Sequence, residues 1–255
     1  MNFKNKTVLI TGASSGIGRE LAVQLAEKGA RLILVARRED RLRELRDHLP
    51  EPESHVYYPC DVSDRDAVQA VCKELLDNGK EIDVLLFNAG VSGEFNIREL
   101  SIDEFESKYR VNFFHVVYFL HYLLPGFLER DRGMIAATSS IAAYRGMPGA
   151  AIYSSSKAAL STLLESMRVD LWPTGIKVTC ISPGFVRSEL TDKNKFWMPF
   201  LMDTDKAVRI IIRGLEREKP EIHFPWMLTI PAKLSRLMPY NMFARFMQGK
   251  RKVRG

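Results

Sequence analysis

The feature that most limits how this chain can fold is a glycine-rich turn between two short apolar runs near the N-terminus. Residues 7–10 are typical of a buried strand, and the eight residues that follow read Thr-Gly-Ala-Ser-Ser-Gly-Ile-Gly. Residues 17–26 then carry apolar side chains at helical spacing, Gly29 ends that pattern, and residues 31–35 form a second apolar run. Strand, turn, helix and strand make a βαβ unit, whose crossover is right-handed almost without exception. The start of the chain therefore predicts two parallel strands joined by a helix.

The same alternation continues along the rest of the chain. Strands are predicted at residues 56–60, 82–87, 133–138, 176–181 and 221–224, and helices at 42–49, 67–76, 105–128, 158–172 and 205–216. Strands that alternate with helices in this way form a parallel sheet covered on both faces. We therefore expect the α/β class, with a Rossmann-type doubly wound parallel sheet of about seven strands. Residues 1–225 would form one domain, and residues 226–255 a C-terminal extension.

Length and composition agree with one α/β domain. The chain has 255 residues, of which 46% are apolar and 27% charged, as in ordinary globular proteins. No apolar run approaches the roughly 18 residues that a membrane span needs, and the N-terminus lacks the apolar segment of a signal peptide. Cys60, Cys72 and Cys180 are odd in number and lack metal-ligand spacing. We expect reduced thiols, no metal site and a cytoplasmic location.

The glycine-rich turn is a candidate phosphate site. Its glycines let the backbone approach a pyrophosphate, which would lie on the positive N-terminal end of the following helix. The spacing is G-x-x-x-G-x-G, and the context between a strand and a helix strengthens a signal that is weak alone. The residues expected to bind a dinucleotide here are Gly12, Ser14, Ser15, Gly16, Ile17 and Gly18.

The end of the second strand indicates which dinucleotide binds. Sites specific for NAD place an acidic residue there for the ribose 2′-hydroxyl, whereas a 2′-phosphate requires arginine. Here the strand ends in Arg37 and Arg38, which offer two guanidinium groups and no carboxylate. A basic surface pair beside a helix is the alternative interpretation. The pair predicts NADP(H) in preference to NAD(H).

Six residues with site chemistry each follow a predicted strand. Ligands of parallel α/β sheets bind beyond the carboxyl ends of the strands, which all lie at one edge. The residues that should collect there are Gly12, Arg37, Asp61, Asn88, Ser140 and Pro183. This convergence predicts one functional site.

Tyr153 and Lys157 stand four positions apart in a helical pattern, so they share one helix face. An unperturbed tyrosine has a pKa of about 10, and a neighbouring ammonium favours the phenolate. We therefore expect Lys157 to lower the pKa of Tyr153. An ordinary amphipathic helix with a surface lysine is the alternative.

Several motifs together resemble the short-chain dehydrogenase/reductase family over about residues 6–188. In chain order they are the turn at 11–18, Cys60-Asp61-Val62, Asn88-Ala89-Gly90, Val111-Asn112, Ser139-Ser140, Tyr153 to Lys157, and Ser182-Pro183-Gly184. Each motif is modest alone, but the ordered set is highly specific. The family's catalytic serine lies thirteen residues before the tyrosine, which selects Ser140 over Ser139.

The resemblance implies catalytic roles for Asn112, Ser140, Tyr153 and Lys157. Hydride would pass between nicotinamide and a carbonyl or carbinol carbon while Tyr153 transfers the proton. Ser140 would bond the substrate oxygen, Lys157 would hold the nicotinamide ribose, and Asn112 would anchor a water. Structural alternatives are a helix cap for Ser140 and a satisfied buried amide for Asn112. Further implied cofactor contacts are Asp61, Val62, Asn88, Ala89, Gly90, Tyr153, Lys157, Pro183, Gly184, Val186 and Ser188.

Two positions depart from the family pattern. Phe87 replaces an asparagine that commonly precedes Asn88, so a hydrogen bond at the strand end would be lost. Ser188 stands where a threonine often contacts the nicotinamide carboxamide, and its hydroxyl can serve in the same way.

The substrate should be set by residues 185–200 and by the extension. The first segment mixes polar turns with aromatic side chains and methionine, which suits a lid over a hydrophobic steroid, lipid, ketone or aldehyde. A plain surface loop is the alternative. We weigh an NADP-dependent oxidoreductase against a non-catalytic NADP-binding sensor on the same fold, and the intact catalytic set favours the enzyme.

The extension carries seven basic residues and no acidic one, although the whole chain has a net charge of only +6. Pro231 and Pro239 should break the extension into short helical pieces. Its basic and apolar residues are interleaved, so it could cover the substrate pocket, pack on a second subunit or contact an anionic membrane surface. We favour packing or a lid, and expect no nucleic-acid binding because the charges form no dense stripe. The resemblance also implies a homodimer or homotetramer, paired through the helices predicted at 105–128 and 153–172.

Overall fold

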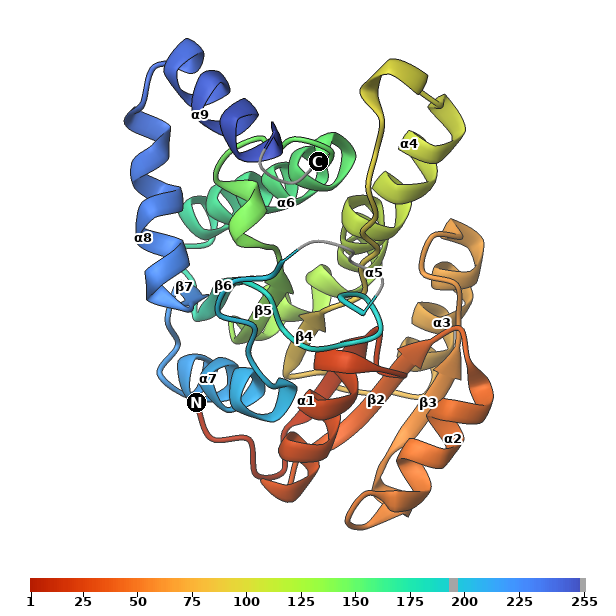
Figure 1. The fold of residues 1–255 in the computed structure, drawn as a ribbon. Helices are drawn as coiled ribbons and strands as arrows, with labels where there is room; N and C mark the ends of the chain where they lie inside the picture. The colour runs from red at the N-terminus through yellow and green to blue at the C-terminus, as the bar shows by residue number, and fades with distance from the viewer. Residues whose placement is uncertain (193–196, 253–255) are drawn as a thin grey trace.

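A seven-stranded parallel sheet forms the centre of the protein. The computed structural model describes residues 1–192 and 197–252. The strands are β1 (Thr7–Thr11), β2 (Arg31–Ala36), β3 (Val56–Pro59), β4 (Val84–Phe87), β5 (Gly133–Thr138), β6 (Ile176–Pro183) and β7 (Glu221–Phe224). Their order in the sheet is β3-β2-β1-β4-β5-β6-β7 (Figure 1). The predicted doubly wound Rossmann-type sheet is confirmed, and the order reverses direction at β1.

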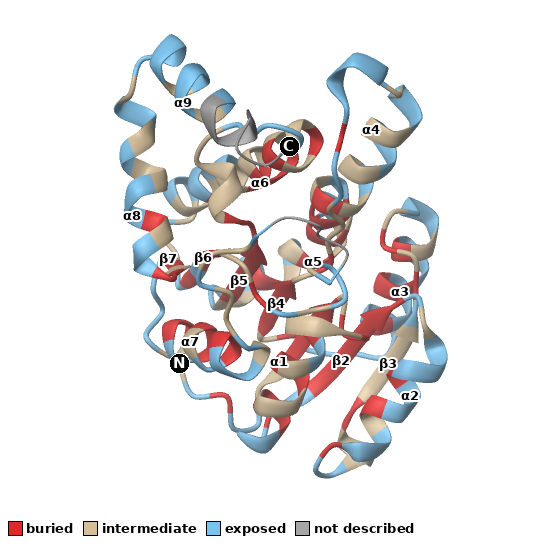
Figure 2. Cartoon of the chain, viewed as in Figure 1, coloured by how far each residue is buried: buried red, intermediate tan, exposed pale blue. Residues whose placement is uncertain are grey.

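Helices cover both faces of the sheet, and alternate residues of each strand point to the two sides. On one side α1 (Gly16–Glu27), α2 (Glu39–His48) and α7 (Thr204–Glu216) pack on Ile10 and Leu34. On the other, α3 (Arg65–Asp77), α5 (His115–Arg130) and α6 (Ala151–Asp170) pack on Leu9 and Ile33. Because both faces are covered, the strands read as continuous apolar runs, and the buried residues concentrate between the layers (Figure 2).

The long helix predicted at 105–128 contains one irregular turn. The structure has α4 (Ile102–Tyr109), a π-helical turn (Arg110–Phe114) and α5 in direct succession. In the π turn the amide of His115 bonds the carbonyl of Arg110, five residues back instead of four. The wider turn directs Asn112 into the interior, where it is fully buried.

This helix is the one segment of the described chain that is long and apolar enough to cross a membrane by length and composition. Its α5 part packs against α3, and Val116 and Phe119 lie in the core beside the sheet. A core helix passes the same test of length and composition, so we interpret it as part of the globular fold.

The C-terminal extension forms α8 (Trp226–Leu234), a 3₁₀ turn (Ser235–Leu237) and α9 (Tyr240–Lys252). The expectation that both prolines interrupt this region was wrong for Pro231, which lies inside α8. A proline removes one backbone hydrogen bond, which a short helix tolerates here without ending. Pro239, in contrast, separates the 3₁₀ turn from α9. Figure 1 shows α8 and α9 on one side, and α4 on the other, extending beyond the sheet edge where the site lies.

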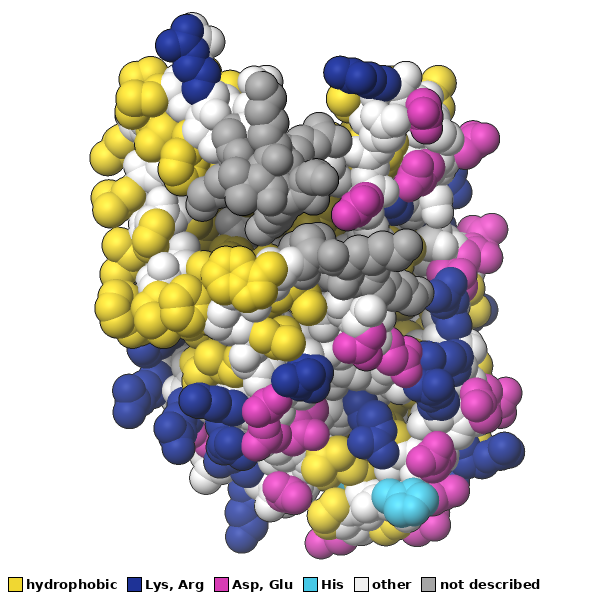
Figure 3. Space-filling view, viewed as in Figure 1, with side chains coloured by type: hydrophobic (Ala, Val, Ile, Leu, Met, Phe, Trp, Pro, Cys, Tyr) yellow, Lys and Arg dark blue, Asp and Glu magenta, His cyan; other side chains and the backbone are white. Residues whose placement is uncertain are grey.

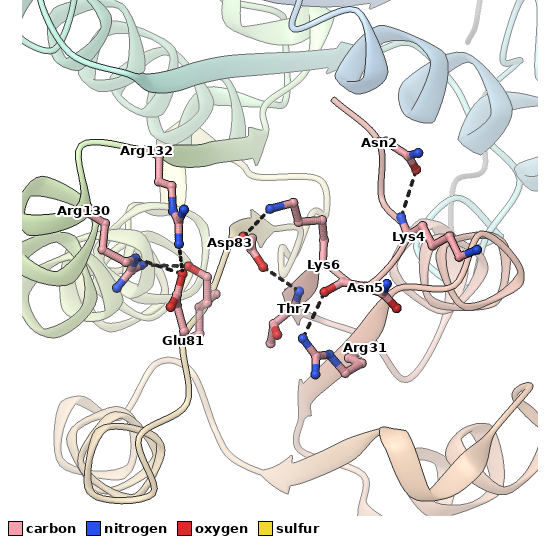
Figure 4. Close-up of polar contacts among 11 residues, drawn as sticks. Asn2, Lys4, Asn5, Lys6, Thr7, Arg31, Glu81, Asp83, Arg130 and Arg132 are labelled. Carbon is pink, nitrogen blue, oxygen red and sulfur yellow. Dashed lines mark hydrogen bonds and ion pairs between the residues drawn. The ribbon is translucent and has the colours of Figure 1, made fainter.

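The amino ends of the strands are held by ion pairs at the opposite edge (Figure 4). Asp83 accepts hydrogen bonds from Lys6 Nζ at 2.8 Å and from the amide of Thr7 at 2.9 Å. Glu81 pairs with Arg132 at 2.7 Å. These charges are satisfied by one another, so this edge fastens β1 to the segments before β4 and β5.

Candidate active site

The glycine turn and the end of β4 meet backbone against backbone. Gly12 has a φ of +70°, and a Cβ added there would lie 2.9 Å from Cα of Ala89. A Cβ on Gly18 would lie 2.2 Å from the carbonyl oxygen of Gly12 and 2.7 Å from Nδ2 of Asn88. Only glycine fits these two positions, so the turn is held tightly against the strand that follows the topological reversal.

The turn fits a dinucleotide phosphate. Helix α1 begins at Gly16 with an extended Ser15 before it, and no described side chain caps its first amides. These amides stay available to an anion, and the helix dipole favours negative charge at this end. The residues present therefore fit the expected cofactor, with Gly12, Gly16 and Gly18 forming the cradle.

Thr11, which the sequence analysis did not assign a role in the site, joins the end of β1 to the residues after β4. Its Oγ1 accepts hydrogen bonds from the amides of Asn88 at 3.0 Å and Ala89 at 3.1 Å. Thr138 Oγ1 donates to Oδ1 of Asn88 at 3.2 Å. Phe87 is buried and packs in the core, so Thr11 supplies the polar contacts at this strand end. Its place at the end of a strand before the glycine turn was the available sequence signal.

Arg37 and Asp61 lie at the expected edge. The Arg37 side chain is 70% exposed and its Nη1 is 3.9 Å from Oδ2 of Asp61. Asp61 also accepts from the amide of Ser63 at 3.0 Å and from its hydroxyl at 2.7 Å. Partial burial acts in the opposite direction, but the bonds from Ser63 and the charge of Arg37 lower the pKa of Asp61. Val62 follows as a buried residue.

Arg38 is engaged on two sides. Its Nε and Nη2 donate to Oγ of Ser14 at 3.3 and 3.2 Å, and its Nη1 pairs with Glu189 at 3.0 Å. Arg41 pairs with the other carboxylate oxygen of Glu189. The sequence analysis assigned neither Glu189 nor Arg41 to the site. Arg41 stands three residues after Arg38 on one helix face, a usable signal, whereas nothing near Glu189 in the sequence indicates this contact.

The segment after β6 lies across the glycine turn. The amide of Gly184 donates to the carbonyl of Phe224 at 2.7 Å, which holds the end of β6 beside β7. Val186 is buried, and a Cβ on Gly16 would lie 3.1 Å from Cβ of Ser188. Pro183 is the last residue of β6, and the other predicted contacts, Gly184, Val186 and Ser188, follow it toward the glycine turn. Residues 193–196 of the predicted lid lie outside the described residues.

Asn112 joins the end of β4 to α6. Its Oδ1 accepts from the amide of Val91 at 2.8 Å, and its Nδ2 donates to the carbonyl of Val91 at 3.0 Å and to Ser156 Oγ at 3.1 Å. A Cβ on Gly90 would lie 3.4 Å from Asn112 Oδ1 and 3.2 Å from Lys157 Nζ. The structure thus brings three predicted residues together. Both polar atoms of the Asn112 side chain are hydrogen-bonded, which agrees with the alternative of a satisfied buried amide. Its role in holding a water stays a prediction.

Ser140 and Tyr153 lie close to each other. Burial raises the pKa of Tyr153, and the nearby Ser140 hydroxyl has a smaller effect that lowers it. Ser140 Oγ also accepts from the amide of Ala142 at 3.1 Å, so it caps a 3₁₀ turn (Ile141–Ala143) as well. Ser139 instead bonds the carbonyl of Lys157 at 2.9 Å. The contacts support Ser140 as the serine that faces the tyrosine.

Lys157 is buried and its ammonium has one close acceptor. Nζ donates to the carbonyl of Thr138 at 2.7 Å and lies 6.0 Å from the centroid of the Tyr153 ring. Burial lowers the pKa of Lys157 to about 8. The expectation that Lys157 lowers the pKa of Tyr153 fails for the protein alone, because burial of the phenol dominates and the ammonium turns to a strand-end carbonyl.

The C-terminal extension is bound to the turn that follows Ser140. Tyr144 donates to Glu221 at 2.6 Å, and Lys233 of α8 pairs with the same carboxylate at 2.5 Å. The Arg145 guanidinium lies 4.1 Å from the centroid of the Phe243 ring in α9. The extension therefore packs on residues 140–145, called the catalytic loop from here on. Its role as a lid or as a subunit contact stays a prediction.

Comparison with known proteins agrees with this arrangement. A family model described as short chain dehydrogenase matches residues 6–198. An uncharacterized oxidoreductase of Myxococcus xanthus is 41% identical over 239 residues, which cover 93% of this chain and 94% of that protein. The 11-beta-hydroxysteroid dehydrogenase-like 2 of Arabidopsis thaliana is 32% identical over 251 residues, covering 94% of this chain and 81% of that protein.

A solved structure gives the same result for the fold. The short-chain dehydrogenase from Sphingobium yanoikuyae in complex with NADPH superposes with a TM-score of 0.81 at 26% identity, covering 97% of this chain and 95% of that one. The glycine cradle follows β1, Ser140 follows β5, and Lys157 contacts the carbonyl at the end of β5, so these residues lie at the same edge of the sheet. The chain belongs to the short-chain dehydrogenase/reductase family of oxidoreductases, which use a nicotinamide cofactor.

Proposed function

We propose that this protein is an NADP(H)-dependent oxidoreductase that interconverts a carbonyl and a secondary alcohol of a hydrophobic substrate, with Tyr153 as the acid and base. The observation that carries the proposal is the placement of the Ser140 hydroxyl next to the buried Tyr153 phenol, with the buried Lys157 ammonium 6.0 Å from the centroid of the same ring. This group lies at the same sheet edge as the glycine cradle, where a dinucleotide fits. A hydroxyl pair next to an ammonium supplies proton transfer and charge stabilisation together.

The chain's own residues would handle the proton and the substrate oxygen. Bound nicotinamide supplies or accepts the hydride. In reduction, the Tyr153 hydroxyl gives its proton to the carbonyl oxygen, and the raised pKa of Tyr153 keeps that proton available at neutral pH. The Ser140 hydroxyl donates to the same oxygen as negative charge develops on it. Lys157 holds positive charge close to the phenol and offers a donor to the cofactor ribose.

The preference for NADP(H) is supported by arginines at the end of β2. Arg37 and Arg38 lie where a ribose 2′-substituent would be expected, and Arg38 already contacts the glycine turn through Ser14. The Sphingobium yanoikuyae neighbour was solved with NADPH. Comparing the affinities for NADPH and NADH tests this part directly; equal affinities would contradict it.

A hydrophobic substrate is supported by the side chains beyond the sheet edge. Trp197 and Phe200, which follow the segment after β6, are 74% and 50% exposed. The extension adds further apolar residues next to the catalytic loop, and the Arabidopsis thaliana relative is named for a hydroxysteroid dehydrogenase. A screen of NADPH oxidation over steroid, lipid and aldehyde carbonyls would identify the substrate class.

The test of the catalytic assignment is Tyr153→Phe. Removing one oxygen should leave NADPH binding unchanged while turnover falls by about 10³-fold or more, since no other group replaces the proton donor. Tyr118→Phe on α5 is the matched control and should retain full activity. Turnover like that of the wild type in Tyr153→Phe would refute the assignment. NADPH binding without turnover of any carbonyl would instead favour the non-catalytic sensor.

The extension has an outer face that we propose contacts an anionic membrane surface while its inner face packs on the catalytic loop. Trp226, Leu234, Leu237 and Tyr240 are 67%, 60%, 82% and 87% exposed, and hydrophobic side chains gather over α8 in Figure 3. With the nearby Arg236, this combination suits the surface of a peripheral, cytoplasmic protein. Of the extension's basic residues, Arg254 lies outside the described residues. Leu234→Ser/Leu237→Ser should abolish sedimentation with anionic vesicles; no sedimentation of the wild type would reject the contact.

We also propose a homo-oligomer that pairs through α5 and α6. Val117 on α5 is 38% exposed, Val169 in the last turn of α6 is 70% exposed, and Trp172, just after α6, is 80% exposed. Apolar surface of this extent favours association. Light scattering of the wild type should give at least a dimer mass, and Val169→Lys should lower it; a monomeric wild type would contradict the proposal.

A further inference from the structure

Glu189 pairs with two of the three arginines Arg37, Arg38 and Arg41, which lie at the end of β2 and the start of α2. One oxygen of its carboxylate accepts a hydrogen bond from Arg38 and the other accepts one from Arg41. These hydrogen bonds, from Arg41 first and Arg38 second, lower the pKa of Glu189, so it is ionised at neutral pH. Arg37 remains 70% exposed, with Asp61 at 3.9 Å. An acid from the segment after β6 thus pairs with Arg38, one of the two arginines expected to bind a phosphate on the cofactor, and with its neighbour Arg41.

The contact spans two parts of the chain that would lie on either side of a bound dinucleotide. Arg38 and Arg41 belong to the end of β2 and to α2, and Arg38 is also fixed by Ser14 of the glycine turn. Glu189 directly follows Ser188, which lies against Gly16 at the start of α1. The ion pair therefore links the segment after β6 to the start of α2, beside the glycine turn.

We propose that Glu189 is a specificity-determining residue that competes with the 2′-phosphate of NADP(H) for Arg38 and Arg41. This inference rests on the proposed NADP-dependent function. A phosphomonoester carries up to two negative charges and three acceptor oxygens, which match the fork of a guanidinium. It cannot share both arginines with a carboxylate without repulsion between like charges, so binding exchanges one anion for the other. A cofactor without the 2′-phosphate leaves the ion pair in place.

The exchange has two consequences. Glu189 weakens the binding of 2′-phosphorylated ligands, and it holds the segment after β6 against the glycine turn until such a ligand binds. Arg41 becomes an additional 2′-phosphate ligand besides Arg37 and Arg38. The cofactor that binds therefore determines whether Glu189 stays paired with Arg41 of α2.

The test compares two ligands that differ only in the 2′-phosphate, adenosine 2′,5′-bisphosphate and adenosine 5′-monophosphate, by titration calorimetry on the full chain. Glu189→Gln keeps the size and an acceptor oxygen but removes the charge. It should bind the bisphosphate roughly tenfold more tightly than the wild type, with the monophosphate unchanged within about twofold. Arg41→Gln should weaken the bisphosphate by a similar factor and leave the monophosphate unchanged.

Asp192→Asn is the matched control, because it removes one negative charge three residues further along the same segment. It should change neither affinity. Unchanged or weaker bisphosphate binding in Glu189→Gln would overturn the proposal, as would an equal gain for both ligands or an equal gain in Asp192→Asn. A wild-type protein that binds neither nucleotide would refute the proposed function itself, whereas a wild type that binds both ligands with Glu189→Gln unaffected refutes only this inference.

Discussion

Replacing Lys157 with methionine should change how the stability of the protein depends on pH. Lys157 is 3% exposed, and burial lowers the pKa of its ammonium from 10.5 to about 8. The protonated form is therefore the penalised one. The penalty is fully present below pH 8, and it falls as the pH rises from 8 toward 10.5, because the folded protein releases its proton first. The gap between the two pKa values corresponds to about 3 kcal/mol.

The expected result is a gain of about 2 kcal/mol in the stability of the wild type, relative to Lys157→Met, between pH 7 and pH 9.5. Methionine also removes the donor to the Thr138 carbonyl, which costs about 1–3 kcal/mol at every pH and shifts the difference without tilting it. Urea unfolding followed by circular dichroism at several pH values measures the difference. Lys177→Met removes an exposed lysine and should run parallel to the wild type.

The reasoning is refuted if the stability difference between wild type and Lys157→Met is flat over this range, or if it falls. Either outcome would mean that the ammonium is solvated or compensated in the fold.

Two further predictions concern the glycine turn and a buried histidine. Gly18→Ala places a methyl group 2.2 Å from the Gly12 carbonyl oxygen, so it should lower the stability by several kcal/mol and abolish NADPH binding. Gly146→Ala is the control, because the space around Gly146 is open, and it should change neither property. A thermal melt measures the stability and a binding titration measures the affinity. His115 is buried and its pKa is lowered to about 3, chiefly by burial and then by the charge of Lys157. The folded protein holds His115 neutral, so the stability is unaffected above pH 6.5 and falls as the pH drops toward 3. By pH 4 the free energy of unfolding of the wild type should fall by about 3 kcal/mol more than that of His115→Leu. Urea unfolding measures both, and equal losses would contradict burial of a neutral imidazole.

The fold was largely predictable because helices cover both faces of the sheet. A strand covered on two sides is apolar throughout, and β4 (Val84–Phe87), which is buried at every residue, lies within the strand predicted at 82–87. The gathering of the site residues followed from the same fact, since parallel strands end at one edge. Asn88, Ser140 and the glycine turn could be placed together without knowing any contact distance.

What could not be predicted depends on how distant segments pack. Glu189 lies 148 residues from Arg41, and no local pattern connects them. The pKa of Tyr153 depends on how much surrounding structure covers the phenol, and helical spacing to Lys157 carries no information about that. Pro231 was expected to end a helix because isolated propensity disfavours it, but packing of α8 against β7 and the catalytic loop outweighed that preference.

The π turn at Arg110–Phe114 sets the angular phase between α4 and α5. Each residue of a regular helix advances the side chains by about 100°, so the additional residue in the wide turn rotates everything after it by that angle. Deleting one residue there would restore a regular helix, but the apolar stripe of α5 would then turn partly away from α3 and the sheet. The extra residue that brings Asn112 inward is thus also the one that keeps two helices in register, so natural length variation in this helix should be found at its ends and not at its middle.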